Sequence, residues 1–107
     1  MRIDDFIQAI RERQKVKVQF YSKEDNCNLS RTCAPMDYGP SRRAKEKNDR
    51  LHLWDFDSDT GQHMLSLNLE QVLTLEILEE KFDPEDFVTW DTASSPWFVP
   101  RDWGNRS

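Results

Sequence analysis

The 107-residue chain lacks the features by which several large protein classes are recognised. No apolar run approaches the ~18 residues of a membrane-spanning helix, and the first residues do not form the apolar stretch of a signal peptide. The three glycines are too scattered for a phosphate-binding loop, and Gly-x-Ser-x-Gly is absent. No nucleophile, base and orienting partner can be assembled from the sequence. We therefore expect a cytoplasmic protein that is not an enzyme and carries no cofactor.

Cysteine is scarce as well, with only Cys27 and Cys33, six positions apart. Without an export signal, reduced thiols are expected rather than a disulfide. Together with His52 and His63 they supply four possible zinc ligands, but none of the spacings is that of a zinc knuckle. The aspartate-rich stretch 55–61 likewise lacks the register of a calcium loop. We expect no bound metal.

Charge is plentiful and unevenly distributed along the chain. Charged residues make up 33% of the sequence and hydrophobic residues 36%, and the apolar residues recur with helix or strand periodicity, so the chain should fold as one domain. Residues 1–53 hold 12 Lys and Arg against 8 Asp and Glu, whereas residues 54–107 hold 3 against 12. If the fold keeps the two halves apart, one face will attract anions and the other will repel them.

The apolar periodicity predicts one helix followed by five strands. Apolar residues at positions 3, 6, 7 and 10 follow the spacing of an amphipathic helix, and residues 15–21 alternate with period two. A second strand over 29–36 should stop at Pro35 or soon after, because proline cannot donate to a strand ladder. Three further strands are expected at 50–57, 63–69 and 72–79, and Asp83 before Pro84 indicates the start of a helical turn.

These elements predict a mainly β (α+β) fold. One amphipathic helix and five short strands with brief turns are typical of a small five-stranded barrel of the SH3 or Sm type, although periodicity alone does not exclude another five-stranded α+β fold. We expect the barrel domain to cover residues 1–88. Residues 89–107 lack periodicity and contain tryptophans and prolines, which predicts an irregular C-terminal tail.

Five segments in this order resemble the WYL domain, over roughly residues 6–87. They are AIRERQKVKVQFY (9–21), Arg31 followed by Pro35, RLHLWDFD (50–57), LSLNLEQVLTLEIL (65–78) and FDPEDF (82–87). The resemblance implies a bacterial regulatory or accessory module built on a small barrel. The winged-helix DNA-binding domain that usually precedes a WYL domain in transcriptional regulators is not found in this chain, so we expect a divergent domain that stands alone.

The departures from the family pattern fall at its ligand surface. The Trp-Tyr-Leu that names the family corresponds to Leu51, His52 and Leu53, and its Asp-Arg before the last strand corresponds to Glu70 and Gln71. Of these five residues, only Leu53 matches the family's leucine and only Glu70 keeps the family's acidic character. The resemblance therefore implies the barrel more firmly than it implies an inherited ligand.

A basic stretch over 39–49 is the strongest candidate for contact with an anion. Cationic residues in and near it can contact phosphates, and aromatic residues on the following strand can stack on bases. The proposed ligand-binding residues are Arg31, Arg42, Arg43, Lys45, His52 and Trp54. The alternative interpretation is a solvated loop beside a strand whose aromatic residues pack in the core. Our first hypothesis is a regulatory module that binds a nucleotide-like or nucleic-acid ligand.

The tail offers a second hypothesis, a protein-interaction module. Trp97, Phe98 and Trp103 either pack back on the barrel or anchor a protein partner or a second copy of the chain, since tryptophan is enriched at binding hot spots. An exposed strand edge could dock a partner in the same way. No membrane partner is expected.

Overall fold

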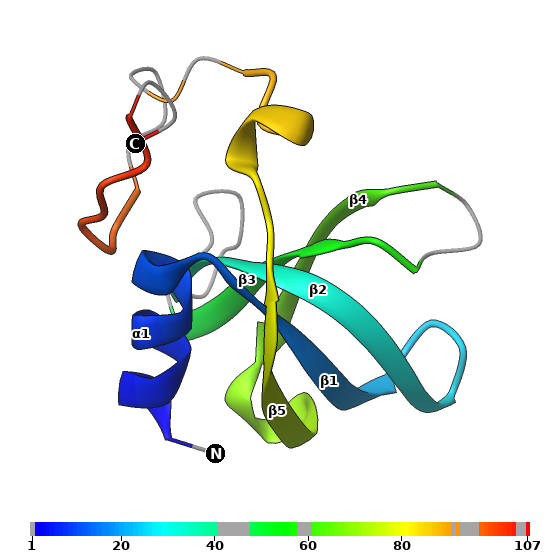
Figure 1. The fold of residues 1–107 in the computed structure, drawn as a ribbon. Coiled ribbons are helices and arrows are strands. Elements are labelled where there is room, and N and C mark those ends of the chain that lie inside the picture. Colours follow the sequence, from blue (N-terminus) through cyan, green and yellow to red (C-terminus); the bar gives the residue numbers. More distant parts are fainter. Residues whose placement is uncertain (1, 41–47, 58–60, 91, 93–96, 105–106) are drawn as a thin grey trace.

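The computed structural model describes residues 2–40, 48–57, 61–90, 92, 97–104 and 107. Over these residues the predicted mainly β fold, with one N-terminal α-helix and five strands, is confirmed (Figure 1). The elements are α1 (Ile3–Glu12), β1 (Gln14–Ser22), β2 (Cys27–Pro40), β3 (Asp49–Asp55), β4 (His63–Asn68) and β5 (Val72–Lys81), with short 3-10 turns η1 (Leu69–Gln71) and η2 (Pro84–Asp86).

Helix α1 buries the apolar stripe that its sequence predicts. Phe6, Ala9 and Ile10 are buried, and acidic residues lie in its first turn, where they complement the helix dipole. The helix ends at Arg13, whose φ of 57° places it in the left-handed region and whose N–H bonds to the carbonyls of Ala9 and Ile10. This cap turns the chain directly into β1, and the Arg13 carbonyl accepts a hydrogen bond of 2.9 Å from the N–H of Phe82.

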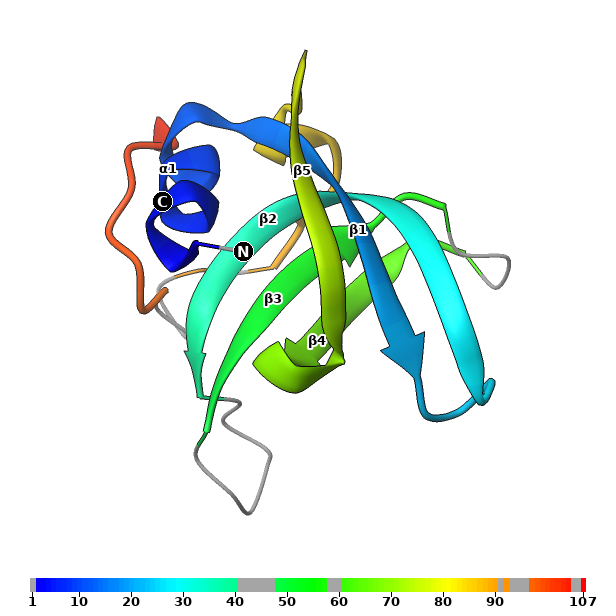
Figure 2. The ribbon, with the colours of Figure 1, turned by 90° about the horizontal axis from the view of Figure 1, so that it is seen from below.

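The five strands form one antiparallel sheet in the order β4-β3-β2-β1-β5. Figure 2 shows that the sheet is strongly curved and that η1 joins its two edge strands. The inner face carries alternating apolar residues, among them Val16, Val18, Leu51, Leu53 and Leu67, each almost completely buried. This arrangement is consistent with the predicted small barrel.

Strand β2 is longer than the sequence predicts. It continues past Pro35 to Pro40, because the pairing with β3 shifts between Pro35 and Asp37. A bulge at this point leaves one residue unpaired, so a proline without an N–H is accommodated and the ladder resumes with Asp37 opposite His52. The prediction that the strand ends near Pro35 was wrong.

The segment after β5 covers the outer side of β3 with aromatic side chains. Five of them and Trp54 of β3 form a closed ring in which neighbouring ring centroids lie 5.1–6.2 Å apart, and we call these six the aromatic ring cluster. Its members, in order around the ring, are Trp54, Phe87, Phe82, Trp103, Trp97 and Trp90. All four tryptophans of the chain therefore belong to one cluster, and aromatic pairs at such distances stabilise a fold beyond their buried area.

The tail is also held by hydrogen bonds. The backbone N–H groups of Phe98 and Val99 donate to the carboxylate of Asp37, at 3.0 and 2.9 Å. The indole N–H of Trp103 donates to the carbonyl of Ile10 at 3.0 Å, which places the tail against the C-terminal end of α1 (Figure 1). In the described residues the tail therefore packs on the barrel.

Candidate ligand pocket

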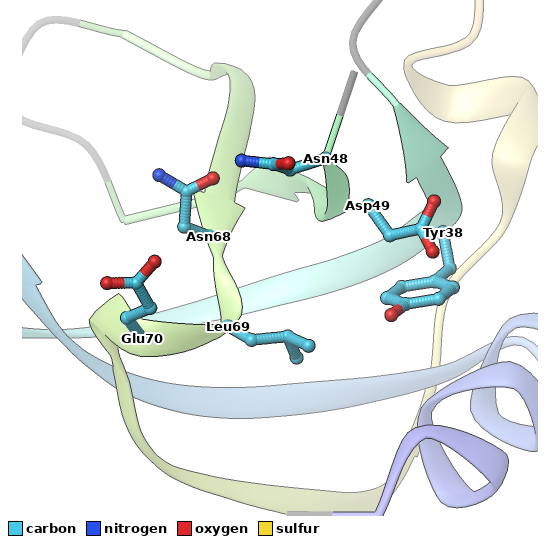
Figure 3. A pocket seen from close by; sticks show the side chains of 6 residues that line it. All are labelled: Tyr38, Asn48, Asp49, Asn68, Leu69 and Glu70. Carbon is cyan, nitrogen blue, oxygen red and sulfur yellow. The ribbon is translucent and has the colours of Figure 1, made fainter. Parts of the chain in front are cut away.

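An open pocket of about 600 Å³ lies where β2 ends, β3 begins and β4 ends. It is lined by Tyr38, Asn48, Asp49, Asn68, Leu69 and Glu70. In Figure 3, Asn68 and Glu70 mark one side, Tyr38 and Asp49 mark the other, and the side chain of Leu69 reaches between them. Pockets of roughly 300–1,000 Å³ are typical sites for small molecules.

The side of the pocket formed by Asn68, Leu69 and Glu70 is fixed by Gln71. The side-chain oxygen of Gln71 accepts a hydrogen bond of 3.1 Å from the backbone N–H of Asn68, and its amide nitrogen donates to the carbonyl of Tyr21 at 3.1 Å. These two bonds tie η1 to the end of β1. Gln71 is thus a structural residue here, whereas the acid before it, Glu70, lines the pocket.

The pocket is acidic and rich in hydrogen-bonding groups. Of the six described residues that line it, two are carboxylic acids, two are amides and one is a phenol, and none of these six is Lys, Arg or His. Partial burial, together with the nearby charge of Asp49, raises the pKa of the Tyr38 hydroxyl above its ordinary value. Tyr38 therefore keeps its proton at neutral pH and can donate a hydrogen bond.

The basic segment predicted to bind anions adjoins this pocket in the chain. Arg42, Arg43 and Lys45 lie outside the described residues. The described residues on either side of them are Pro40, at the end of β2, and Asn48, which lines the pocket. The basic segment therefore leaves and rejoins the sheet at the end where the pocket lies.

Arg31 lies on β2, beside the end of β3 that is opposite the pocket. Its Nε lies 3.4 Å from the carboxylate of Asp55, which is almost fully buried, so Arg31 neutralises an acid of the fold. The pocket begins at Asp49, and the seven residues of β3 span about 20 Å at the usual rise per residue. The structure thus does not bring Arg31 to the pocket.

His52 and Trp54 point to the outer side of β3 and have partners within the chain. The ring nitrogens of His52 lie 2.9 Å from the carbonyl of Gly39 and 2.8 Å from the hydroxyl of Ser66. Trp54 stacks on Phe87 with ring centroids 5.1 Å apart. Neither residue is among the residues that line the pocket, and ligand binding by the predicted residues stays a prediction.

The predicted partner-binding residues of the tail differ in exposure. Trp103 is only 5% exposed, and Trp97 is partly buried between Trp90 and Trp103. Phe98 is 43% exposed. A partner that contacts the folded chain can therefore reach Phe98 but not the indole of Trp103, and binding of a partner by the tail stays a prediction.

Sequence reasoning did not single out most of the residues that line the pocket. Asn48 and Asp49 precede or begin β3 and Asn68 ends β4, and the pairing of Arg50 with Asn68 between these strands brings them to the same end of the sheet. Glu70 was visible as the acid at a family ligand position.

In the part of the chain that the structure describes, no group of three or more His, Cys, Asp or Glu side chains could hold a metal ion. None of the described helices is long and apolar enough to span a bilayer.

Comparison with known proteins supports the fold. No family model matches the sequence, and no curated protein matches it either. Among solved structures, it is similar to Proteasome accessory factor B/C (PafBC) of Arthrobacter aurescens, with a TM-score of 0.55 and 16% sequence identity. The match covers 92% of this chain and 13% of PafBC.

The matched part of PafBC shares the overall fold of this chain. At 16% identity this likeness shows the fold alone. Because the chain spans only about an eighth of PafBC, the activity and partners of that protein do not transfer to it.

Proposed function

We propose that the chain is a WYL-like regulatory or accessory module of the bacterial cytoplasm that binds a nucleotide-like or nucleic-acid ligand and catalyses no reaction. The observation that carries the proposal is the position of the pocket, at the end of the sheet where the basic segment 41–47 leaves and rejoins it. The pocket has the volume of a small-molecule site, and the segment supplies positive charge.

The charge of the basic segment supports contact with phosphate. Residues 41–47 contain four cationic side chains and one acidic one, Glu46, in a protein whose formal net charge is -5. Concentrated positive charge in an acidic protein attracts phosphate groups locally. Such contacts release counterions from a nucleic acid, so the affinity should fall steeply as salt is raised.

Fluorescence anisotropy with labelled single-stranded DNA, labelled RNA and a labelled guanine nucleotide tests the proposal at low and near-physiological salt. The double variant Arg42→Ala with Arg43→Ala should weaken binding about tenfold or more and lower the salt slope by roughly one to two. The matched control is Lys23→Ala with Lys81→Ala, which removes the same charge from exposed positions away from the pocket.

Equal losses in the two double variants would show that binding reflects net charge alone. Absence of salt-sensitive binding to all three probes would overturn the proposal. Loss confined to Arg42→Ala with Arg43→Ala would support it.

A further inference from the structure

We propose that the free edge of β5 docks an extended, lysine- or arginine-containing segment of another protein, which joins the sheet as an added strand. In strand addition, backbone hydrogen bonds supply affinity and the side chains beside the edge select the segment. None of the β5 residues is among the described residues that line the pocket. The inference therefore goes beyond the proposed function and does not depend on a nucleotide-like ligand.

Strand β5 is an edge strand of the described sheet. It stands at the end of the order β4-β3-β2-β1-β5, and the described strand that pairs with it is β1. Figure 2 shows β5 along the rim of the curved sheet. Because β1 uses one side of β5, the backbone N–H and C=O groups on the other side have no partner strand among the described residues. With ten residues, β5 is longer than the ~5–6 residues of a typical strand and offers a complete pairing site.

The hydrophobic core is less completely covered along β5 than along β1. Val16 and Val18 of β1 are fully buried, whereas Ile77 and Leu75, which pair with them from β5, are only partly buried. Leu73, near the start of β5, is 52% exposed, the highest value among the large apolar side chains that the structure describes. A strand added beside β5 would remove part of this apolar surface from water, which favours binding.

The surface along β5 and beyond its end is acidic. Residues 76–86 contain six acids and one lysine, and η2 continues the chain beyond the end of β5 (Figure 1). The six acids are all exposed, and they are Glu76, Glu79, Glu80, Asp83, Glu85 and Asp86. On β1, Lys15 pairs with Glu80 at 3.1 Å and Lys17 lies opposite Glu76. The other four acids form no ion pair within the described part of the chain.

This charge decides which kind of strand fits the edge. Opposite charges on neighbouring strands stabilise a sheet, and like charges directly opposite each other destabilise it. Pairing of β5 with the β5 of a second copy would bring two acidic strands together. Phosphate groups of a nucleic acid would be repelled in the same way. A protein segment that alternates apolar residues with lysine or arginine covers the apolar surface and meets the acids.

Fluorescence anisotropy of the full chain with labelled synthetic peptides tests the inference. The probe is a nine-residue peptide of alternating lysine and valine. One comparison peptide has every backbone nitrogen methylated, so it keeps its charge but cannot donate backbone hydrogen bonds, and the other has glutamate in place of lysine. Each comparison peptide should bind about tenfold or more weakly than the probe, because the first loses the backbone bonds and the second meets like charge.

Amide hydrogen exchange followed by NMR shows where the probe binds. In the free chain, the β5 amides that donate to β1 should exchange slowly, and those pointing to the free edge should exchange quickly. Binding of the probe should slow exchange at these edge amides, which alternate along β5, by about tenfold or more. Exchange in β4, the other edge strand, should be unchanged.

A charge variant with a matched control tests the role of the acids. Glu76→Gln with Glu79→Gln should weaken binding of the probe roughly two- to tenfold, the range expected for two exposed charge pairs. The control, Asp5→Asn with Glu24→Gln, removes the same charge from exposed positions on α1 and in the turn between β1 and β2. It should leave the affinity unchanged, and thermal melts show whether each variant is folded.

Each outcome supports or overturns the inference. Tighter binding of the probe than of the methylated peptide, with slowed exchange at alternate β5 amides, would support it. Equal binding of these two peptides, or equal losses in the two charge variants, would overturn it by showing adsorption through charge alone. Absence of probe binding, or slowed exchange on β4 in place of β5, would also overturn it. Edge amides of β5 that are already protected in a chain that sediments as a dimer would overturn it in favour of a second copy.

Discussion

Arg101 in the C-terminal tail forms an ion pair with Asp37 on β2, with 3.3 Å between the guanidinium nitrogen and the carboxylate oxygen, and both side chains are more than nine-tenths buried. The guanidinium carbon lies 4.3 Å from the ring centroid of Trp97 and 4.4 Å from that of Trp103. Burial lowers the pKa of Arg101 to about 10, and Asp37 acts in the opposite direction. The arginine therefore stays charged at neutral pH, and this pair fastens the tail to the sheet.

Asp37→Asn should strongly destabilise the fold. The substitution leaves Arg101 buried without a counter-charge, and removal of one partner of a buried ion pair costs about 3–5 kcal/mol. Urea unfolding followed by circular dichroism measures the change. The control is Glu80→Gln, because the Lys15–Glu80 pair has an N–O distance of 3.1 Å but Glu80 is 66% exposed. This exposed pair should contribute less than about 1 kcal/mol, and equal losses in the two variants would contradict a stabilising tail.

Trp103 should be the most sensitive residue of the tail. It is buried, donates to the Ile10 carbonyl and packs edge-on against Phe82 at 5.5 Å. Trp103→Ala should cost about 3–5 kcal/mol, and Trp103→Phe roughly 1–3 kcal/mol because it keeps most of the ring volume but loses the N–H donor. Thermal melts of both variants measure these losses of stability, and Leu73→Ala, at a 52% exposed position, serves as the comparison. Equal melting temperatures for Trp103→Ala and Leu73→Ala would show that the tail is not docked in solution.

The helix and the strands were predictable because their signal is local. Helical spacing of apolar residues and period-two alternation both arise from neighbouring residues, and Asp83 caps η2 by accepting from the N–H of Glu85 at 3.0 Å, as an Asp-Pro start predicts. The end of β2 was not predictable. Its extension past Pro35 depends on a bulge formed against β3, and a bulge is a property of two strands together.

The candidate site was less predictable than the fold. Arg31 has the sequence context of an exposed strand residue, and its pairing with Asp55 arises only from the register between strands. The pocket draws Tyr38, Asp49 and Asn68 from three strands, so no local pattern links them. The aromatic residues of the tail were recognised as a group, but their two alternatives, packing on the barrel or on a partner, differ only in tertiary contacts.

Cys33 should make the fold less stable at alkaline pH. Burial, with additional effects from Asp55 and Asp57, raises the pKa of its thiol far above the ordinary 9.0. The unfolded thiol loses its proton above about pH 9 while the folded thiol keeps it, so the unfolded state binds fewer protons and the free energy of unfolding falls as pH rises. The limiting slope for one group is about 1.4 kcal/mol per pH unit.

Denaturant unfolding between pH 7.5 and 10.5 measures this dependence. Cys33→Ala should flatten the alkaline decline, and Cys27→Ala, at an exposed position, should leave it unchanged. In the native protein a thiol reagent should label Cys27 rapidly and Cys33 slowly, as mass spectrometry of digested samples will show. Equal labelling rates, or the same alkaline slope in both variants, would contradict the burial of Cys33.

Gly39 is required because the tail approaches its backbone too closely for a side chain. A Cβ at this position would lie 2.6 Å from the Cδ2 atom of Phe98 and 3.1 Å from its Cβ, so either the ring or the tail backbone must move. Gly39→Ala should therefore cost roughly 1–3 kcal/mol in the native sequence. In a Phe98→Ala background the ring is absent, and the same substitution should cost much less. A double-mutant cycle by urea unfolding measures this coupling. Identical costs in the two backgrounds would mean that Phe98 does not lie over Gly39 in solution.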